Sequence, residues 1–177
     1  MAITLKSIHE RPKNGEAIVL VGLPGSGKST WAANFKYGYP VLSSDRHIEE
    51  LALRDKIDYA ESFRRNYKEA IRLFRGEVEK FRHTRESFIW DQMNATRAER
   101  EIIYKILSPT HKVTYVCFLT PFEECLRRLD MRKRDMGPMA EEKFLRRMAD
   151  NIEYPQSGSG EPFDHLVRIT HPDWRGE

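Results

Sequence analysis

One stretch determines the fold of this chain: Ala17-Ile18-Val19-Leu20-Val21-Gly22-Leu23-Pro24-Gly25-Ser26-Gly27-Lys28-Ser29-Thr30. Its first five residues are a short apolar run, which is typical of a buried strand. Residues 22–29 match the pattern G-x-x-x-x-G-K-[ST], a glycine-rich turn that connects a strand to a helix. Residues 29–35 can begin that helix. The strand and the helix that the motif requires are therefore both present, and a glycine-rich turn without a ligand is the less favoured interpretation.

This loop predicts a binding site for the phosphates of ATP. Glycines let backbone N–H groups point inward around phosphate oxygens, and the helix N-terminus adds partial positive charge. In the motif, Lys28 reaches the β- and γ-phosphates and the Ser29 hydroxyl binds Mg²⁺. We therefore expect ATP and Mg²⁺ as cofactors. The expected ATP-binding residues of the loop are Gly22, Pro24, Gly25, Ser26, Gly27, Lys28, Ser29 and Thr30.

Composition limits the class of protein. The chain has 177 residues, of which 40% are hydrophobic and 32% charged, as in folded globular domains. No apolar run approaches the length of a membrane span, and residues 1–6 lack the features of a signal peptide. We expect a cytoplasmic protein without a membrane partner, in the host cytoplasm if the gene is phage-encoded. Cys117 and Cys125 lack zinc spacing and are expected as reduced, buried thiols.

Strand and helix patterns alternate along the chain, which predicts an α/β fold with a mainly parallel sheet and helices on both faces. This is the P-loop NTPase-like three-layer sandwich. Strands are expected at 17–21, 40–45, 88–91, 112–119 and 166–169, and helices at 29–35, 61–82, 96–107, 121–134 and 140–152. We expect an N-terminal extension at 1–16 and a single domain at 17–177. The break Met136-Gly137-Pro138-Met139 predicts a small helical lid at about 128–140.

Two acidic residues lie at the ends of predicted strands, where the loop at Gly22 also begins, so all three should meet at the carboxyl edge of the sheet. Asp45 is the candidate group that accepts or orients the proton of an attacking hydroxyl. Its alternative role is to cap the helix that begins near Arg46. Asp91 could hold the metal through water or orient a group on the acceptor side, with a cap or Asx-turn as an equally weighted alternative.

Two further polar features near these strands are expected to be structural. Thr96 and Glu99 fit a capping box. The six histidines are scattered, and only His47 could touch an acceptor because it lies beside Asp45. A position on the surface is the favoured interpretation for His47.

Positive charge gathers in two segments. Residues 127–134 hold five cations and one acid, and an arginine there could stabilise the charge of phosphoryl transfer. A solvated basic helix face is the alternative. Residues 61–85 hold eight Lys or Arg against four Glu, with one stripe formed by Arg64, Lys68, Arg72, Arg75 and Arg82. This stripe suits a nucleic-acid backbone, and the alternative is a solubilising face in which Arg65 pairs with Glu69.

Together these motifs resemble the kinase domain of phage-type polynucleotide 5′-hydroxyl kinases, within the broader set of small P-loop kinases. The resemblance covers residues 17–152 through the phosphate loop and Trp31, then Ser43-Ser44-Asp45-Arg46, Asp91-Gln92-Met93-Asn94, and the lid arginines Arg128 to Arg132. It implies that Lys28 contacts the β- and γ-phosphates, that Ser29 binds the metal, that Asp45 activates the acceptor hydroxyl and that Arg132 acts from the lid.

The remaining assignments follow the same resemblance and the basic stripe. Arg128 is expected on ATP, and the expected substrate-binding residues are Arg46, Asp91, Asn94, Arg64, Lys68 and Arg72. One position departs from the family. Polynucleotide 5′-kinases tend to carry an arginine one turn after the aspartate, where it contacts the acceptor's phosphate, and here that position is Ile48.

The favoured hypothesis is an ATP-dependent kinase, a phosphotransferase with an alcohol group as acceptor, that acts on nucleic acid and most simply on a polynucleotide 5′-OH. A close variant phosphorylates a hydroxymethyl group on a modified base, such as 5-hydroxymethyluracil, within phage DNA and would therefore be a DNA-modification enzyme. Other hypotheses are a small-molecule kinase for a nucleoside, sugar or antibiotic, and a nucleotide-gated binding module with little phosphate transfer.

Overall fold

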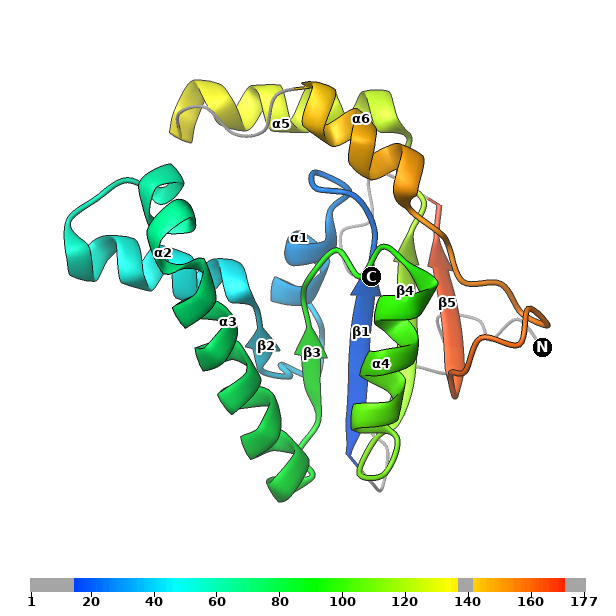
Figure 1. Cartoon of the computed structure of the whole chain (residues 1–177). Coiled ribbons are helices and arrows are strands. Elements are labelled where there is room, and N and C mark those ends of the chain that lie inside the picture. The colour runs from blue at the N-terminus through cyan, green and yellow to red at the C-terminus, as the bar shows by residue number, and fades with distance from the viewer. Residues whose placement is uncertain (1–14, 137–141, 171–177) are drawn as a thin grey trace.

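The computed structural model describes residues 15–136 and 142–170 and contains one parallel five-stranded sheet (Figure 1). The strand order is β2-β3-β1-β4-β5, and every neighbouring pair is parallel. The strands are β1 (Glu16–Val21), β2 (Val41–Leu42), β3 (Phe88–Trp90), β4 (Lys112–Phe118) and β5 (His165–Ile169). The α/β fold predicted from the sequence is confirmed, with β1 at the centre of the sheet and the phosphate loop at its carboxyl end.

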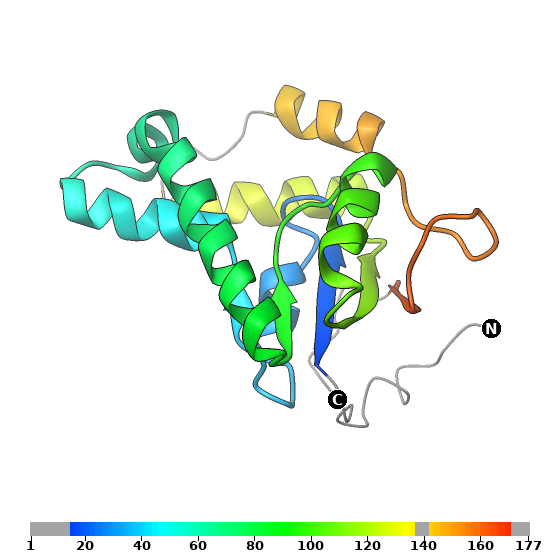
Figure 2. The same cartoon turned by 60° about the horizontal axis from the view of Figure 1, so that its bottom comes forward.

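Helices cover both faces of the sheet and also its carboxyl edge (Figures 1 and 2). The helices are α1 (Lys28–Ala33), α2 (Ser44–Asp55), α3 (Tyr59–Thr84), α4 (Arg97–Leu107), α5 (Phe122–Met136) and α6 (Glu142–Asn151). Helices α3 and α4 pack on one face and α1 packs on the other. Helices α5 and α6 lie over the carboxyl edge (Figure 1). No helix within the described ranges is both long enough and apolar enough to cross a membrane.

The core consists of two apolar layers that share strand β1. All residues from Ala17 to Val21 are fully buried, because a central parallel strand is covered on both faces. Val19 belongs to the layer under α3 and α4, which also holds Phe74, whereas Leu20 belongs to the layer under α1 with Trp31. The continuous apolar run that predicted a buried strand is therefore buried on both sides.

Helix α2 is the element that the sequence pattern indicated only by its start. Its N-cap is Ser43, whose side chain accepts a hydrogen bond from the backbone N–H of Asp45 at 3.2 Å. The alternative that Asp45 itself caps this helix is therefore wrong, since Asp45 lies in the first turn. Helix α3 begins before the expected residue 61, because Asp58 caps it and accepts from the Glu61 N–H at 2.8 Å.

Other local predictions have clear outcomes. The capping box of Thr96 and Glu99 is confirmed at the start of α4. Cys117 and Cys125 are buried free thiols. The first strand begins at Glu16, one residue before its expected start. Residues 137–139 of the predicted break and most of the predicted extension at 1–16 lie outside the described residues, and Met136 is the last residue of α5.

Candidate active site

The phosphate loop is seated against α5 through a position that only glycine can occupy. Gly25 has a φ of +79°, and a Cβ atom there would lie 2.6 Å from the backbone oxygen of Cys125. Gly27, with a φ of +100°, is the N-cap of α1. The Thr120 hydroxyl donates to the backbone oxygen of Ser26 at 2.8 Å, which ties the loop to the segment after β4. The loop is therefore held by contacts on two sides.

Lys28 lies within the loop, as the motif predicts. The residue is buried, and its Nζ donates to the backbone oxygens of Gly22 and Leu23, each at 2.8 Å. The hydroxyl of Ser26 is buried and has no hydrogen-bond partner among the described groups. A buried unpaired hydroxyl costs free energy unless a ligand satisfies it. A lysine and an unpaired hydroxyl in one glycine-rich loop fit the phosphates of a nucleotide.

Ser29 and Asp91 form the part of the site that fits Mg²⁺. The exposed Ser29 makes a side-chain hydrogen bond with the buried carboxyl of Asp91. Burial raises the pKa of Asp91, while this hydrogen bond and the charge of Lys28 oppose the rise. The described residues contain no group of three or more His, Cys, Asp or Glu that could hold a metal ion. Mg²⁺ in nucleotide sites is bound by few protein oxygens together with phosphates, and the Ser29–Asp91 pair fits that arrangement.

Asp45 lies near the same groups, at the start of α2. It is exposed to solvent, yet partial desolvation by the surrounding protein raises the pKa of its carboxyl above the ordinary range. The negative charge of Asp91 adds to this rise, whereas Lys28 and a hydrogen bond from Tyr59 oppose it. The structure therefore brings together the four groups that the sequence placed at strand ends or in the loop: Lys28, Ser29, Asp45 and Asp91.

The arginine expected on ATP lies beside the loop. In α5, Arg128 Nε donates to Glu124 at 2.6 Å. Its Nη1 would be 3.4 Å from a Cβ atom built on Gly27, so the guanidinium group borders the phosphate loop. Arg127 and Arg128 lower the pKa of Glu124 to about 2. Arg132 follows one helical turn later in α5, and its side chain lies outside the described residues.

Several other predicted residues contact protein groups away from the loop. Arg46 forms an ion pair with Glu77 of α3. His47 is 5% exposed and contacts the same carboxylate at 3.0 Å, so its expected surface position is wrong. The reason is a polar contact between α2 and α3: the acidic partner of His47 is Glu77, which lies 30 positions away in the sequence.

Asn94, which was expected to bind substrate, contacts the protein backbone instead. Asn94 is buried, has a φ of +47°, and its side-chain amide donates to the Leu20 backbone oxygen at 2.6 Å. These contacts fit a residue that positions the loop rather than one that touches substrate.

The Arg65–Glu69 pair of the alternative interpretation of the basic stripe is wrong, because Arg65 pairs with Glu61 and Glu69 pairs with Arg54 of α2. The stripe members Arg64, Lys68, Arg72 and Arg75 are exposed on α3.

Two structural partners of the site were missed from the sequence. Arg100 is fully buried, binds Glu161 at 2.6 Å, and donates to the backbone oxygens of Asn94 and Ala95. The signal for its burial was its spacing of three and seven from apolar residues 103 and 107, which places all three on one helix face. Tyr59 had no comparable signal, because its partner Asp45 lies in another helix.

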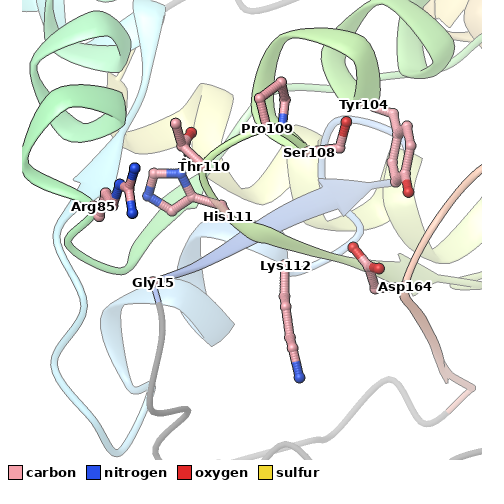
Figure 3. A pocket seen from close by; sticks show the side chains of 9 residues that line it. All are labelled: Gly15, Arg85, Tyr104, Ser108, Pro109, Thr110, His111, Lys112 and Asp164. Carbon is pink, nitrogen blue, oxygen red and sulfur yellow. Dashed lines mark hydrogen bonds between the residues drawn. The ribbon is translucent and has the colours of Figure 1, made fainter.

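A separate cavity of about 510 Å³ lies at the other end of the sheet (Figure 3). It is formed where β1 and β4 begin, whereas the phosphate loop follows the end of β1. Its lining residues are Gly15, Arg85, Tyr104, Ser108, Pro109, Thr110, His111, Lys112 and Asp164. None of them belongs to the residues predicted for ATP or acceptor, so we place the site at the loop and not in this cavity.

Comparisons with known proteins agree with this fold. Residues 18–155 match the family model described as AAA domain, and the chain belongs to that family. The fold is also shared with solved kinases. A protein designated a kinase from Chloroflexus aurantiacus J-10-fl has a TM-score of 0.64 and 16% identity, over 89% of this chain and 86% of that one. No curated protein matches the chain.

Two further solved structures show how widely this fold is used. A chain of the Pnkp1/Rnl/Hen1 RNA repair complex has a TM-score of 0.61 and 19% identity, over 81% of this chain and 46% of that chain. Shikimate kinase from Acinetobacter baumannii has a TM-score of 0.52 and 20% identity, over 89% and 85% of the two chains. The chain therefore has the P-loop kinase fold, and the fold alone is compatible with large and small acceptors.

Proposed function

We propose that this protein is an ATP- and Mg²⁺-dependent kinase that transfers the γ-phosphate to a hydroxyl of nucleic acid, with a polynucleotide 5′-OH as the favoured acceptor. The observation that carries the proposal is the position of Asp45. Asp45 is an exposed residue, its carboxyl accepts a hydrogen bond from Tyr59, and it lies near enough to Lys28 and Asp91 for their charges to affect its pKa. A carboxylate in this position can accept or orient the proton of an attacking hydroxyl.

Each neighbouring group has a role that follows from its contacts. Lys28 can exchange its two bonds to loop oxygens for bonds to phosphate oxygens. Asp91 holds the Ser29 hydroxyl in the position from which it can bind the metal. Mg²⁺ supplies charge neutralisation on the β- and γ-phosphates when it is bound. Arg128, beside Gly27, adds a cation close to the loop, where charge develops during transfer.

The choice of nucleic acid as acceptor rests on the charge of α3. This helix begins at the carboxyl edge of the sheet and carries the exposed cations Arg64, Lys68, Arg72 and Arg75. Such a row suits a chain of phosphates, and a small neutral acceptor would have no use for it. The likeness to a chain of an RNA repair complex supports the same choice.

A second acceptor is favoured by one specific observation. Ile48, which replaces the arginine that the resembling 5′-kinases use to contact the acceptor's phosphate, is fully buried against Leu51 and Ala70. Ile48 therefore provides no contact to a phosphate at the 5′ end of an acceptor strand. A hydroxymethyl group on a modified base within DNA needs no such contact, although the base must leave the stack to reach Asp45.

Transfer of labelled γ-phosphate to a set of acceptors tests the proposal. The set contains 5′-OH DNA and RNA oligonucleotides, 5′-phosphorylated duplexes with and without an internal hydroxymethyl base, free nucleosides and shikimate. Label on 5′-OH strands supports end phosphorylation, and label on the modified duplex alone supports the second acceptor. Efficient transfer to a small molecule with none to DNA or RNA would overturn the nucleic-acid proposal.

A further inference from the structure

Helix α3 extends past the carboxyl edge of the sheet (Figure 1). It has 26 residues, a length of about 39 Å at 1.5 Å per residue, whereas the adjacent β3 has three residues. The second half of α3 packs on the sheet, where Phe74 and Phe81 contact Trp90 and Phe88 with ring centroids 4.8 Å and 5.4 Å apart. The first half therefore projects over the edge at which the phosphate loop lies.

The apolar face of α3 continues along this projecting half. Residues 63, 67, 74 and 81 share one helix face, but Phe63 and Tyr67 are 45% and 46% exposed. With Tyr59 they form a row of three rings, which we call the aromatic ladder, with centroids 6.3 Å and 5.3 Å apart. The ladder begins at the residue that hydrogen-bonds Asp45. The aromatic ladder therefore leads directly to the proposed catalytic carboxyl.

The two flanks of the ladder differ in charge. One flank packs on α2, where Asn66 binds Asp55 and Glu69 pairs with Arg54. The other flank carries Arg64, Lys68, Arg72 and Arg75, which we call the cationic flank. Arg64 pairs with Glu61, and within the described ranges the other three form no ion pair. The acids at positions 69 and 77 are directed to α2 instead, so the cationic flank keeps a net positive charge.

We propose that the aromatic ladder is a stacking platform for the bases next to the acceptor hydroxyl, with their phosphates on the cationic flank. Aromatic rings beside a cationic groove are how proteins bind unpaired strands, because every base has a face that can stack. This inference rests on the proposed function, since it needs a nucleic-acid acceptor, and it narrows the acceptor to an unpaired strand at the reacting end. A second copy of the chain is the competing occupant: an antiparallel two-fold contact would bring both cationic flanks together and is disfavoured, and the oligomeric state of the Leu variants tests the other arrangements.

The experiment compares single substitutions at the ladder with a matched control. Phe63→Leu and Tyr67→Leu keep apolar volume but remove the rings, and Phe63→Trp keeps a ring. Ile102→Ala, at an exposed apolar residue of α4, is the control. KM and kcat are measured for 5′-OH oligonucleotides of one to eight nucleotides and for ATP. The fluorescence that the Phe63→Trp variant gains over the wild-type protein is measured during titration with oligothymidylate.

The expected result is a KM for oligonucleotides about tenfold higher for each ring removed. The KM for ATP should stay unchanged in every variant, and Ile102→Ala should also keep the wild-type KM for oligonucleotides. Phe63→Trp keeps a ring, so its KM for oligonucleotides should lie below that of Phe63→Leu. Oligothymidylate should quench the fluorescence that Phe63→Trp adds. An unchanged oligonucleotide KM in both Leu variants would overturn the platform while leaving the kinase proposal intact. A dimer that the Leu variants dissociate without a change in this KM would assign the ladder to a subunit contact instead.

The failure of the proposed function has a different signature. If the wild-type protein phosphorylates no DNA or RNA, the kinase proposal fails on that result alone. Oligothymidylate could still quench the fluorescence that Phe63→Trp adds, and the double variant with Tyr67→Leu could show weaker quenching. These two results together would support the ladder as a nucleic-acid surface. Absence of quenching would overturn the ladder as well.

Discussion

Loss of the Glu161 carboxylate should destabilise the domain more than loss of any surface acid. Its partner Arg100 is fully buried, with Nε and Nη2 at 2.6 Å and 3.0 Å from the Glu161 oxygens. Arg100 Nη1 donates to the backbone oxygens of Asn94 and Ala95 at 3.0 Å and 2.8 Å. In Glu161→Ala the guanidinium group keeps only these two neutral partners, and a buried positive charge is left without an anion.

The magnitude follows from this burial. Removal of one partner from a buried ion pair costs about 3–5 kcal/mol. For a domain of this size, 1 kcal/mol corresponds to a shift in Tm of about 2–4 °C, so the fall in Tm should be roughly 6–20 °C. The surface pair of Arg97 and Glu101, with side chains 43% and 35% exposed, is the matched control. Its loss in Glu101→Ala should cost about 0–1 kcal/mol.

Urea unfolding followed by circular dichroism measures both costs, and a third variant tests the cause. The double variant Arg100→Met with Glu161→Leu removes both charges, so it should be more stable than Glu161→Ala. Since Asn94 holds the Leu20 backbone oxygen below the phosphate loop, Glu161→Ala should also raise the KM for ATP. Equal free energies of unfolding for Glu161→Ala and Glu101→Ala would show that the Glu161 carboxylate does not stabilise the buried Arg100 charge.

Three further predictions concern the site. Gly25→Ala should weaken ATP binding in calorimetry far more than Gly158→Ala, because both glycines have positive φ but only Gly25 faces an atom within 4 Å; equal effects would exclude the contact with Cys125 as the cause. Tyr59→Phe removes a hydrogen bond that lowers the pKa of Asp45, so the acid limb of the kcat/KM profile, where Asp45 becomes protonated, should move to higher pH; an unmoved limb would separate Asp45 from the titration. Arg132→Ala should lower kcat far more than it raises the KM for ATP, and a change confined to that KM would contradict a role in the transition state.

The sequence predicted those parts of the fold whose signals are local. The apolar run of β1, the glycine-rich loop and the capping box of Thr96 and Glu99 each lie within a few residues. The meeting of Asp45 and Asp91 could also be predicted, because both follow strands and the carboxyl ends of parallel strands lie at one edge. These features needed no knowledge of tertiary contacts.

The features that were missed depend on partners far apart in the chain. His47 is buried with its Nε2 3.0 Å from a carboxylate oxygen of Glu77 in α3, and a sequence window around His47 contains no sign of that residue. Arg100 is buried because Glu161 follows 61 positions later. Burial of such polar side chains depends on a distant partner. The local pattern alone favoured a surface position for His47, and for Arg100 it indicated the buried helix face but not the partner.

In the first half of α3, the sequence pattern predicts burial for side chains that the structure leaves exposed. The helical period of Phe63, Tyr67 and Phe74 predicts one apolar face, and a core position for all three would be the simple interpretation. The structure buries only Phe74, because the sheet ends before the helix does. Because α3 is longer than the sheet on which it packs, Phe63 and Tyr67 remain exposed to a ligand.

We propose above that Asp45 makes this phosphate loop a phosphotransferase site for a nucleic-acid hydroxyl. The measurement that tests it most directly is γ-phosphate transfer to a 5′-OH oligonucleotide by the wild-type protein and by Asp45→Asn, with ATP affinity measured in parallel. We predict transfer that falls about 10²–10⁴-fold in the variant, with little change in ATP affinity. Equal transfer by both proteins, or wild-type transfer only to a small molecule, would contradict the claim.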